Sequence, residues 1–270
     1  MDNNNRIRVC VAGATGWAGS ELSKALAGSE EFHLVSAVSR NSAGKNLKDL
    51  FNLTSDIPVF ATIEEALAVG CDVLVEYTNP EIARHNIITA LQKGVNVVVG
   101  TSGLSDEDYK EIDEIAQQQQ KAVLAVGNFA ISVVLLNKFA EMAAKYMSNW
   151  EIIDYASASK PDSPSGSARE LAYRLGNVQR QTLKIPIEQT KGVPATRGAD
   201  LNGTQVHAVR LPGFVISLEA IFGNPDEKLT IKHEAGNSAA PYVQGAFLAI
   251  RNVGTFTGLK RGLDSVMNLQ

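Results

Sequence analysis

The sequence has few cysteines and few histidines. Of its 270 residues, two are cysteine and 4 are histidine. Neither type occurs at a spacing typical of a metal site, so we expect no bound metal. Two isolated thiols, Cys10 and Cys71, also form no disulfide framework, which favours a reducing compartment, the cytoplasm.

No segment predicts a membrane span or a secretory signal. The longest apolar run, about residues 130–136, is far shorter than the roughly 20 residues that a membrane helix needs. Residues 1–6 are polar and lack the apolar core of a signal peptide. The net charge of -4 gives no basic excess for binding nucleic acid. We therefore expect a soluble protein with neither membrane nor nucleic-acid partners.

The first half of the chain alternates short apolar runs with helical periodicity. Such an alternation is typical of an α/β fold, a Rossmann-type doubly wound parallel sheet with helices between its strands. We expect residues 1–128 to form this dinucleotide-binding domain. The predicted strands are 8–12, 33–38, 71–77, 95–99 and, as the last, 121–126, and the predicted helices are 19–27, 80–93 and 105–120.

The pattern changes after about residue 128. Strand-like runs then come close together, which predicts a second α+β domain over residues 129–239, built on a mixed sheet. Residues 240–270 contain helical periodicity and are expected to pack back on the first domain. The predicted strands are 151–156, 205–211, 215–222 and 228–233, and the predicted helices are 133–146, 167–175 and 239–253.

A glycine-rich loop follows the first predicted strand. Gly13, Gly16 and Gly19 form a GxxGxxG pattern between a strand and a helix. Glycines there permit a tight turn and close approach of a pyrophosphate, and the helix start supplies N–H donors. The candidate cofactor contacts in this loop are Gly13, Thr15, Gly16, Trp17 and Ala18.

The end of the second predicted strand selects the cofactor. NAD-selective sites carry an acidic residue there, which binds the ribose 2′-hydroxyl. This sequence has Ser39 and Arg40 instead, so no carboxylate at this position repels a 2′-phosphate. A guanidinium pairs well with phosphate. The sequence predicts NADPH as the cofactor, with NADH as the alternative.

Six further motifs lie along the chain. They read EYTNPE at 76–81, GTSG at 100–103, GNF at 127–129, KPDSPSGSA at 160–168, VHAVRLPG at 206–213 and LTIKH at 229–233. Together they resemble the dihydrodipicolinate reductase family, also called 4-hydroxy-tetrahydrodipicolinate reductase, whose enzymes act in bacterial lysine biosynthesis. The motif at 160–168 is the most specific of the six.

The resemblance implies a function for each domain. Members of this family are oxidoreductases that use NAD(P)H to reduce a C=N or conjugated C=C bond, and they form homotetramers through the sheet of the second domain, which also binds substrate. The cofactor contacts that the resemblance adds are Thr78, Gly100, Thr101, Ser102, Asn128 and Phe129.

The segment at 160–168 also has a physical interpretation of its own. Ser165, Gly166 and Ser167 begin a predicted helix, where N–H groups and hydroxyls attract an anion. Lys160 adds a cation a short loop away. These residues predict a clamp for a small carboxylated substrate, to which Ser157 contributes a hydroxyl. The alternative is an ordinary helix cap beside a solvated lysine.

The sequence departs from the family at one place. The resemblance implies a His-His pair shortly before Lys160, one member of which acts as general acid, whereas this chain has Ala156 and Ser157. Lys160 is then the one catalytic candidate, with Tyr155 a second donor whose direction the sequence does not fix. We expect an NADPH-dependent reductase of a cyclic imine or enamine carboxylate, weakly active on the family substrate. The alternative is a non-catalytic NADP-binding sensor or scaffold.

Overall fold

The structure is a computed structural model that describes residues 6–181 and 183–268. The polar N-terminal residues 1–5 lie outside this range. The chain divides into two compact units. The first contains the residues up to Ile131 together with those from Ala239 onward, and the second contains Ser132–Ser238.

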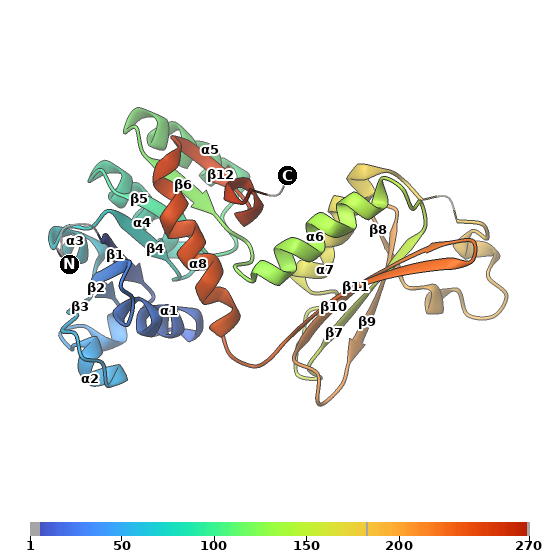
Figure 1. Ribbon diagram of the computed structural model, residues 1–270, viewed down its shortest axis with the longest axis horizontal. Coiled ribbons are helices and arrows are strands. Elements are labelled where there is room, and N and C mark those ends of the chain that lie inside the picture. Colours follow the sequence, from blue (N-terminus) through green and yellow to red (C-terminus); the bar gives the residue numbers. More distant parts are fainter. Residues whose placement is uncertain (1–5, 182, 269–270) are drawn as a thin grey trace. The chain divides into compact units, whose positions relative to one another are not determined.

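The first unit is built on a seven-stranded sheet in the order β12-β6-β5-β4-β1-β2-β3, in which every pair of neighbours is parallel (Figure 1). Its strands are rich in valine, alanine and leucine, and most of them are fully buried, as expected of a sheet covered on both faces. Their bounds are β1 Ile7–Ala12, β2 Phe32–Val38, β3 Val59–Phe60, β4 Val73–Glu76, β5 Asn96–Val99, β6 Ala122–Ala125 and β12 Gly258–Arg261.

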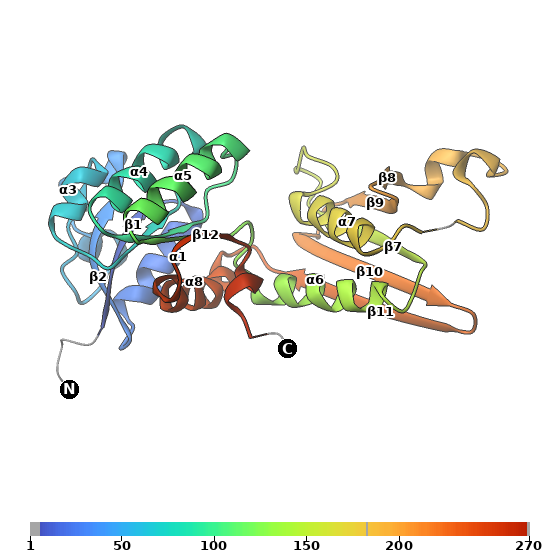
Figure 2. The ribbon, with the colours of Figure 1, turned by 90° about the horizontal axis from the view of Figure 1, so that it is seen from above.

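Helices cover both faces of this sheet. Figure 2 shows α3, α4 and α5 on one side and α1 and α8 on the other. Apolar side chains of the first three pack on strand residues such as Cys10, Leu74 and Val97. This confirms the doubly wound α/β fold. The helices are α1 Trp17–Ala27, α2 Leu47–Phe51, α3 Ile63–Ala68, α4 Pro80–Gln92, α5 Asp106–Gln118 and α8 Ala240–Asn252.

Two strands of this sheet were not predicted. The expectation that residues 121–126 form the last strand is wrong, because Gly258–Arg261 pairs with β6 in parallel and extends the sheet. Its sequence, GLKR, has one apolar side chain, and it lies at an edge where alternation is weak. At the other edge, β3 contains two residues, too few for any periodicity to be detected.

The second unit is built on a mixed five-stranded sheet in the order β11-β10-β7-β9-β8. Strands β7 and β9 are parallel, and the other neighbours are antiparallel, which confirms the mixed sheet. The strands are β7 Trp150–Ala156, β8 Ala199–Leu201, β9 Thr204–Arg210, β10 Ile216–Asn224 and β11 Glu227–Ala235.

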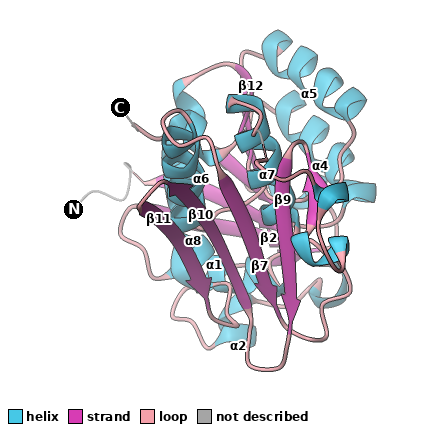
Figure 3. Ribbon diagram, turned by 90° about the vertical axis from the view of Figure 1, so that its right-hand side faces the viewer, coloured by secondary structure: helices cyan, strands magenta, loops and turns pink. Residues whose placement is uncertain are grey.

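Two helices, α6 (Ile131–Ala144) and α7 (Gly166–Val178), cover one face of the mixed sheet. The buried core between them contains Leu136, Leu171, Ile152 and Phe222. Figure 3 shows the sheet with α6 and α7 behind it, so that the face without helices is turned to the viewer. Along β7, burial alternates strictly, and the residues on the face without helices are only half-buried.

No helix in the described part of the chain is long and apolar enough to cross a membrane. Among the same residues, no group of three or more histidine, cysteine or carboxylate side chains is arranged to hold a metal ion.

Candidate functional site

The predicted cofactor residues all follow the carboxyl ends of parallel strands in the first unit. Because neighbouring parallel strands end at the same edge of a sheet, these residues gather at that edge. Strand β1 lies between β2 and β4, so the chain changes direction across the sheet there. This is the place where open α/β sheets bind nucleotides. The contributing segments are 13–18 after β1, 39–40 after β2, Thr78 after β4, 100–102 after β5 and 128–129 after β6.

The glycine-rich loop leaves the start of α1 open. Gly13 has a φ of +78°, a conformation that other residues rarely adopt, and a Cβ there would lie 2.4 Å from the Tyr77 carbonyl oxygen. Gly16 precedes the helix, and no side chain caps it. No side-chain oxygen therefore competes for the first N–H groups of α1, at Trp17 and Ala18, and uncapped N–H groups of this kind can bind an anion.

A cavity of about 370 Å³ lies beside this loop. Gly13, Ser39 and Arg40 all line it, as a dinucleotide site requires. The hydroxyl groups of Thr15 and Ser39 are 2.7 Å apart and join the loop to the end of β2. Arg40 is exposed at its place in the lining, where its guanidinium can reach a phosphate.

The cavity also contains a carboxylate that was not predicted from the sequence. Glu64, from α3, lines it together with His85 of α4, and the two side chains are 2.7 Å apart. The Glu64 carboxylate accepts hydrogen bonds from its own backbone N–H and from His85, and both lower its pKa. The end of β2 carries no acid, but the cavity as a whole is therefore not free of negative charge.

A second carboxylate, Glu76, lies fully buried behind the cavity wall at the end of β4. Thr78 donates both its N–H and its hydroxyl to Oε1, the former at 2.7 Å. Asn86 of α4 donates to Oε2 at 2.7 Å, and the hydroxyl of Thr101 lies 3.4 Å from Oε1. No role of Glu76 was predicted from the sequence, although an acid at the end of an otherwise apolar strand is a detectable signal.

Aromatic packing explains the glycine after β5. A Cβ on Gly100 would overlap the rings of Tyr77 and Phe129, which meet edge to face with centroids 5.4 Å apart. Burial raises the pKa of Tyr77, whose hydroxyl has no hydrogen-bond partner among the described residues. The other predicted contacts differ in exposure: Thr101 is buried, Asn128 is half-buried and accepts from the N–H of Ala130, and Ser102 and Trp17 are exposed.

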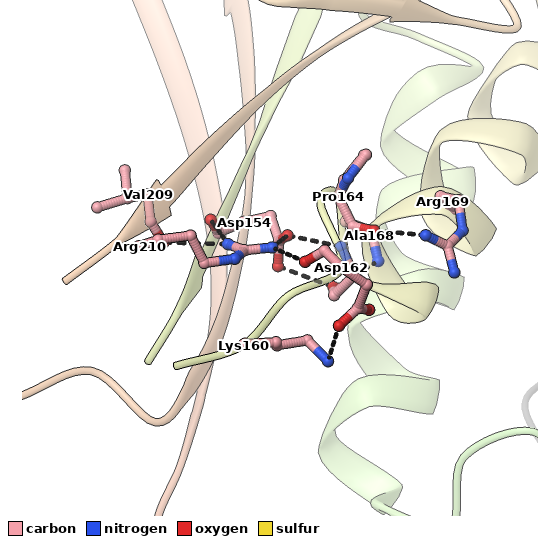
Figure 4. A network of polar contacts seen from close by, with 9 residues as sticks. Asp154, Lys160, Asp162, Pro164, Ala168, Arg169, Val209 and Arg210 are labelled. Atoms are coloured by element: carbon pink, nitrogen blue, oxygen red, sulfur yellow. Dashed lines mark hydrogen bonds and ion pairs between the residues drawn. The ribbon is translucent and has the colours of Figure 1, made fainter. Parts of the chain in front are cut away.

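In the second unit, the start of α7 already binds a carboxylate of the chain itself (Figure 4). Asp154 of β7 accepts from the Ser165 N–H at 2.7 Å and from its hydroxyl at 2.8 Å. The same hydroxyl accepts from the N–H of Ala168 and caps the helix. Of the predicted clamp, the Ser165 donors are thus used internally, whereas Gly166 and Ser167 form the first turn of α7.

A buried ion pair supports this helix start. Arg210 of β9 donates to Asp154 Oδ2 at 2.7 Å and to the Asp162 carbonyl oxygen at 2.9 Å (Figure 4). The side chains of Asp154 and Arg210 are 2% and 17% exposed. This ion pair was not predicted from the sequence. Its signal was an aspartate between Ile152 and Ala156, at a position of β7 that alternation assigns to the core.

Lys160 lies in the loop before α7, and its ammonium group is 2.7 Å from a carboxylate oxygen of Asp162 (Figure 4). The hydrogen bond from Lys160 lowers the pKa of Asp162. Ser157 is half-buried, and its hydroxyl lies 2.9 Å from that of Ser159. An incoming carboxylate would therefore compete with Asp162 for Lys160.

The remaining donors of the second unit point elsewhere. Tyr155 donates to Glu219 at 3.1 Å and lies on the other face of β7 from Asp154, which excludes it as a proton donor beside α7. His207 pairs with Glu151, 2.8 Å away, on that same helix-free side. His233 is buried against Ser132, and burial lowers its pKa.

Comparison with family models covers nearly the whole chain. Residues 7–129 match the model described as "Dihydrodipicolinate reductase, N-terminus", and residues 132–267 match "Dihydrodipicolinate reductase, C-terminus".

Curated relatives match over their full length. The chain is 34% identical over 266 residues to 4-hydroxy-tetrahydrodipicolinate reductase from Bacillus pumilus (strain SAFR-032), covering 98% of this chain and 99% of the relative. It is 35% identical over 264 residues to the protein of the same name from Oceanobacillus iheyensis, with 97% and 99% covered.

Solved structures agree in fold. A dipicolinate-bound dihydrodipicolinate reductase from Paenisporosarcina sp. TG-14 superposes with a TM-score of 0.86 at 28% identity, covering 97% of this chain and 100% of that one. An amine dehydrogenase from Mycobacterium smegmatis gives 0.69 at 16% identity, with 100% and 98% covered, which shows a shared fold alone.

Proposed function

Because the chain belongs to the dihydrodipicolinate reductase family, a family of NAD(P)H-dependent oxidoreductases, we propose that it reduces a cyclic imine or enamine carboxylate with NADPH. One observation supports the proposal: each unit offers a candidate binding element for such a reaction. The uncapped start of α1 opens beside a nucleotide-sized cavity, and Lys160 lies in the loop before the first turn of α7.

NADPH is the proposed cofactor because of the charges at the end of β2. Arg40 lines the cavity, and the neighbouring Ser39 is held by Thr15. A guanidinium and a hydroxyl both bind a 2′-phosphate. The negative charge of Glu64 opposes this preference, but one of its carboxylate oxygens is already engaged by His85. When bound, the dihydronicotinamide supplies the hydride.

Lys160 is the proposed substrate ligand. It binds the substrate carboxylate once that carboxylate has displaced Asp162 from the ammonium group. Gly166, Ser167 and Ser157 contribute N–H groups and a hydroxyl around it. Ser165 then acts by fixing the helix start through Asp154. Reduction of a C=N bond delivers hydride to carbon and a proton to nitrogen. An iminium substrate already carries that proton, which suits a site where Ala156 and Ser157 replace an imidazole pair.

A panel of cyclic imino acids tests this function. Each compound is mixed with NADPH and protein, and NADPH consumption is followed together with NADPH binding in the same solution. Turnover of any carboxylated ring supports the reductase. Tight NADPH binding without turnover of any compound supports the second candidate, a sensor or scaffold, which the absent imidazole pair favours.

We also propose that the protein is a cytoplasmic homotetramer. The sheet face without helices bears half-buried side chains such as Ile153, Tyr155 and Ile221, typical of a surface that another subunit covers. Cys10 and Cys71 are free thiols, as a reducing compartment allows. Sedimentation velocity measures the mass of the assembly, and a monomer at all concentrations would contradict the tetramer.

A further inference from the structure

The buried carboxylate of Glu76 determines which atoms of its neighbours face the cofactor cavity. An ionised carboxylate only accepts hydrogen bonds, so every neighbour must turn a donor toward it. The Thr78 hydroxyl donates to Oε1 of Glu76, and the Asn86 amide nitrogen donates to Oε2. Both of these residues also line the cavity.

The consequence is a wall of acceptors. Once the Thr78 hydroxyl has donated its hydrogen inward, only its lone pairs are available to a ligand. Because the Asn86 amide nitrogen points toward Glu76, its Oδ1 points away from Glu76 and can accept a hydrogen bond from a ligand. The part of the cavity wall that Thr78 and Asn86 form is therefore suited to N–H and O–H groups of a nucleotide and unsuited to its phosphates, which only accept.

We propose that Glu76 is a positioning residue that fixes the hydrogen-bond polarity of this wall and so selects how the dinucleotide lies in the cavity. Phosphates are directed to the start of α1 and to Arg40, while an amino, amide or hydroxyl group of the cofactor donates to Thr78 and Asn86. The inference rests on the proposed dinucleotide binding and adds a determinant of its orientation.

Thr101, in the loop after the neighbouring strand β5, also contacts Glu76. Its hydroxyl is buried and lies 3.4 Å from Glu76 Oε1 and 3.3 Å from the Glu76 carbonyl oxygen. One carboxylate thus joins the turn after β4, helix α4 and the loop after β5. Burial raises the pKa of Glu76 above its usual value, although all of these hydrogen bonds act against the rise.

The variant Glu76→Gln tests the polarity directly. Glutamine has nearly the same shape, but its amide nitrogen donates, so Asn86 or Thr78 must reverse to avoid two facing donors. We expect NADPH to bind about ten-fold more weakly, in line with one misdirected hydrogen bond to a charged group. Glu31→Gln is the matched control, because Glu31 binds Arg251 at the surface of the same unit.

Three cofactor analogues, each lacking one donor, supply a readout that a purely structural role would not move. One carries a 6-oxo purine, one a 3-acetylpyridine in place of the nicotinamide, and one lacks the 3′-hydroxyl of the adenosine ribose. We expect the unmodified protein and Glu31→Gln to bind at least one analogue about ten-fold more weakly than NADPH, the value of one hydrogen bond. In Glu76→Gln that difference should largely disappear.

Equal relative affinities for all three analogues in Glu76→Gln and in the unmodified protein would overturn the inference. If Glu76→Gln does not fold, Thr78→Val carries the same test, since it removes one wall acceptor and keeps the carboxylate. Glu76→Asp keeps the charge and should restore part of the discrimination. Failure of the unmodified protein to bind NADPH at all would instead contradict the proposed function.

Discussion

Arg40 is the residue on which cofactor choice depends most. It follows β2 and lines the cavity beside Ser39. We expect Arg40→Asp to weaken NADPH binding at least ten-fold, because a carboxylate there repels the 2′-phosphate and accepts from a ribose hydroxyl instead. NADH binding should stay the same or improve. Fluorescence titration with both cofactors measures the ratio of the two affinities.

Glu64→Gln is the companion variant for that titration. It removes the negative charge of the carboxylate that lines the cavity and leaves Arg40 in place, so the preference for NADPH should increase. Equal affinity of the unmodified protein for NADPH and NADH would show that neither side chain discriminates between them.

Glu76 gives a prediction about pH. Burial places its folded-state pKa above about 4.5, the usual value for glutamate. A raised carboxyl pKa means that the folded state binds the proton more tightly than the unfolded state does. The contribution of Glu76 to stability is therefore complete below pH 4.5 and declines as pH rises through the folded-state value. Thermal unfolding of both proteins, measured from below pH 4.5 upward, tests this prediction. The unmodified protein should lose stability relative to Glu76→Gln as the pH rises.

At the scale of single elements, the loop before α7 offers a paired test. Lys160→Ala should weaken dipicolinate binding strongly and leave NADPH binding unchanged, because the lysine lies in the second unit. Asp162→Asn should tighten dipicolinate binding two- to five-fold, since it releases Lys160 from a surface ion pair. Calorimetry measures both. The same dipicolinate affinity in all three proteins would place the clamp elsewhere.

Strongly periodic elements were predictable, and short or polar ones were not. The valine-rich β5 and the capped, amphipathic α5 follow from the sequence alone, as do the parallel and mixed sheets. Strand β12 was not predicted because its sequence, GLKR, does not alternate between apolar and polar residues. Its place in the sheet also depends on a partner 136 residues earlier, since Gly258 pairs with Ala122 (258 − 122 = 136).

The candidate site shows the same division. The glycine loop, Arg40 and Lys160 belong to local motifs, and motif reasoning also identified the family correctly. Glu76, Glu64 and the Asp154–Arg210 pair depend on contacts between distant segments: Asp154 and Arg210 are 56 residues apart. Hydrogen bonds of that kind leave no local pattern. For Glu76 and Asp154, the one sign in the sequence is a single acid in an apolar strand.

At the scale of the whole molecule, the absent imidazole pair should limit the family reaction. General acid catalysis contributes roughly 10² to 10⁴ in rate, so turnover of the dihydrodipicolinate precursor should be lower by a comparable factor than in relatives with the pair. NADPH binding should be normal. Steady-state kinetics beside a histidine-bearing relative measures the deficit, and robust turnover by the unmodified protein would refute it.

Ser157→His is the better of the two restoring variants. Ser157 is half-buried, whereas Ala156 is 1% exposed, so an imidazole at 156 would overpack the core. We expect Ser157→His to recover part of the lost rate without loss of stability and Ala156→His to lower the melting temperature. An unchanged rate in a stable Ser157→His would indicate that the proton comes from Lys160, water or the substrate itself.

We propose above all that this chain transfers hydride from NADPH to a carboxylated ring. The most direct measurement uses NADPH deuterated at the transferable position of its nicotinamide, incubated with the protein and each cyclic imino acid, and mass spectrometry of the products. We expect a product that carries one deuterium on a ring carbon for at least one compound, and we expect Lys160→Ala to form no such product. NADPH that binds tightly but yields no deuterated product from any compound would contradict it.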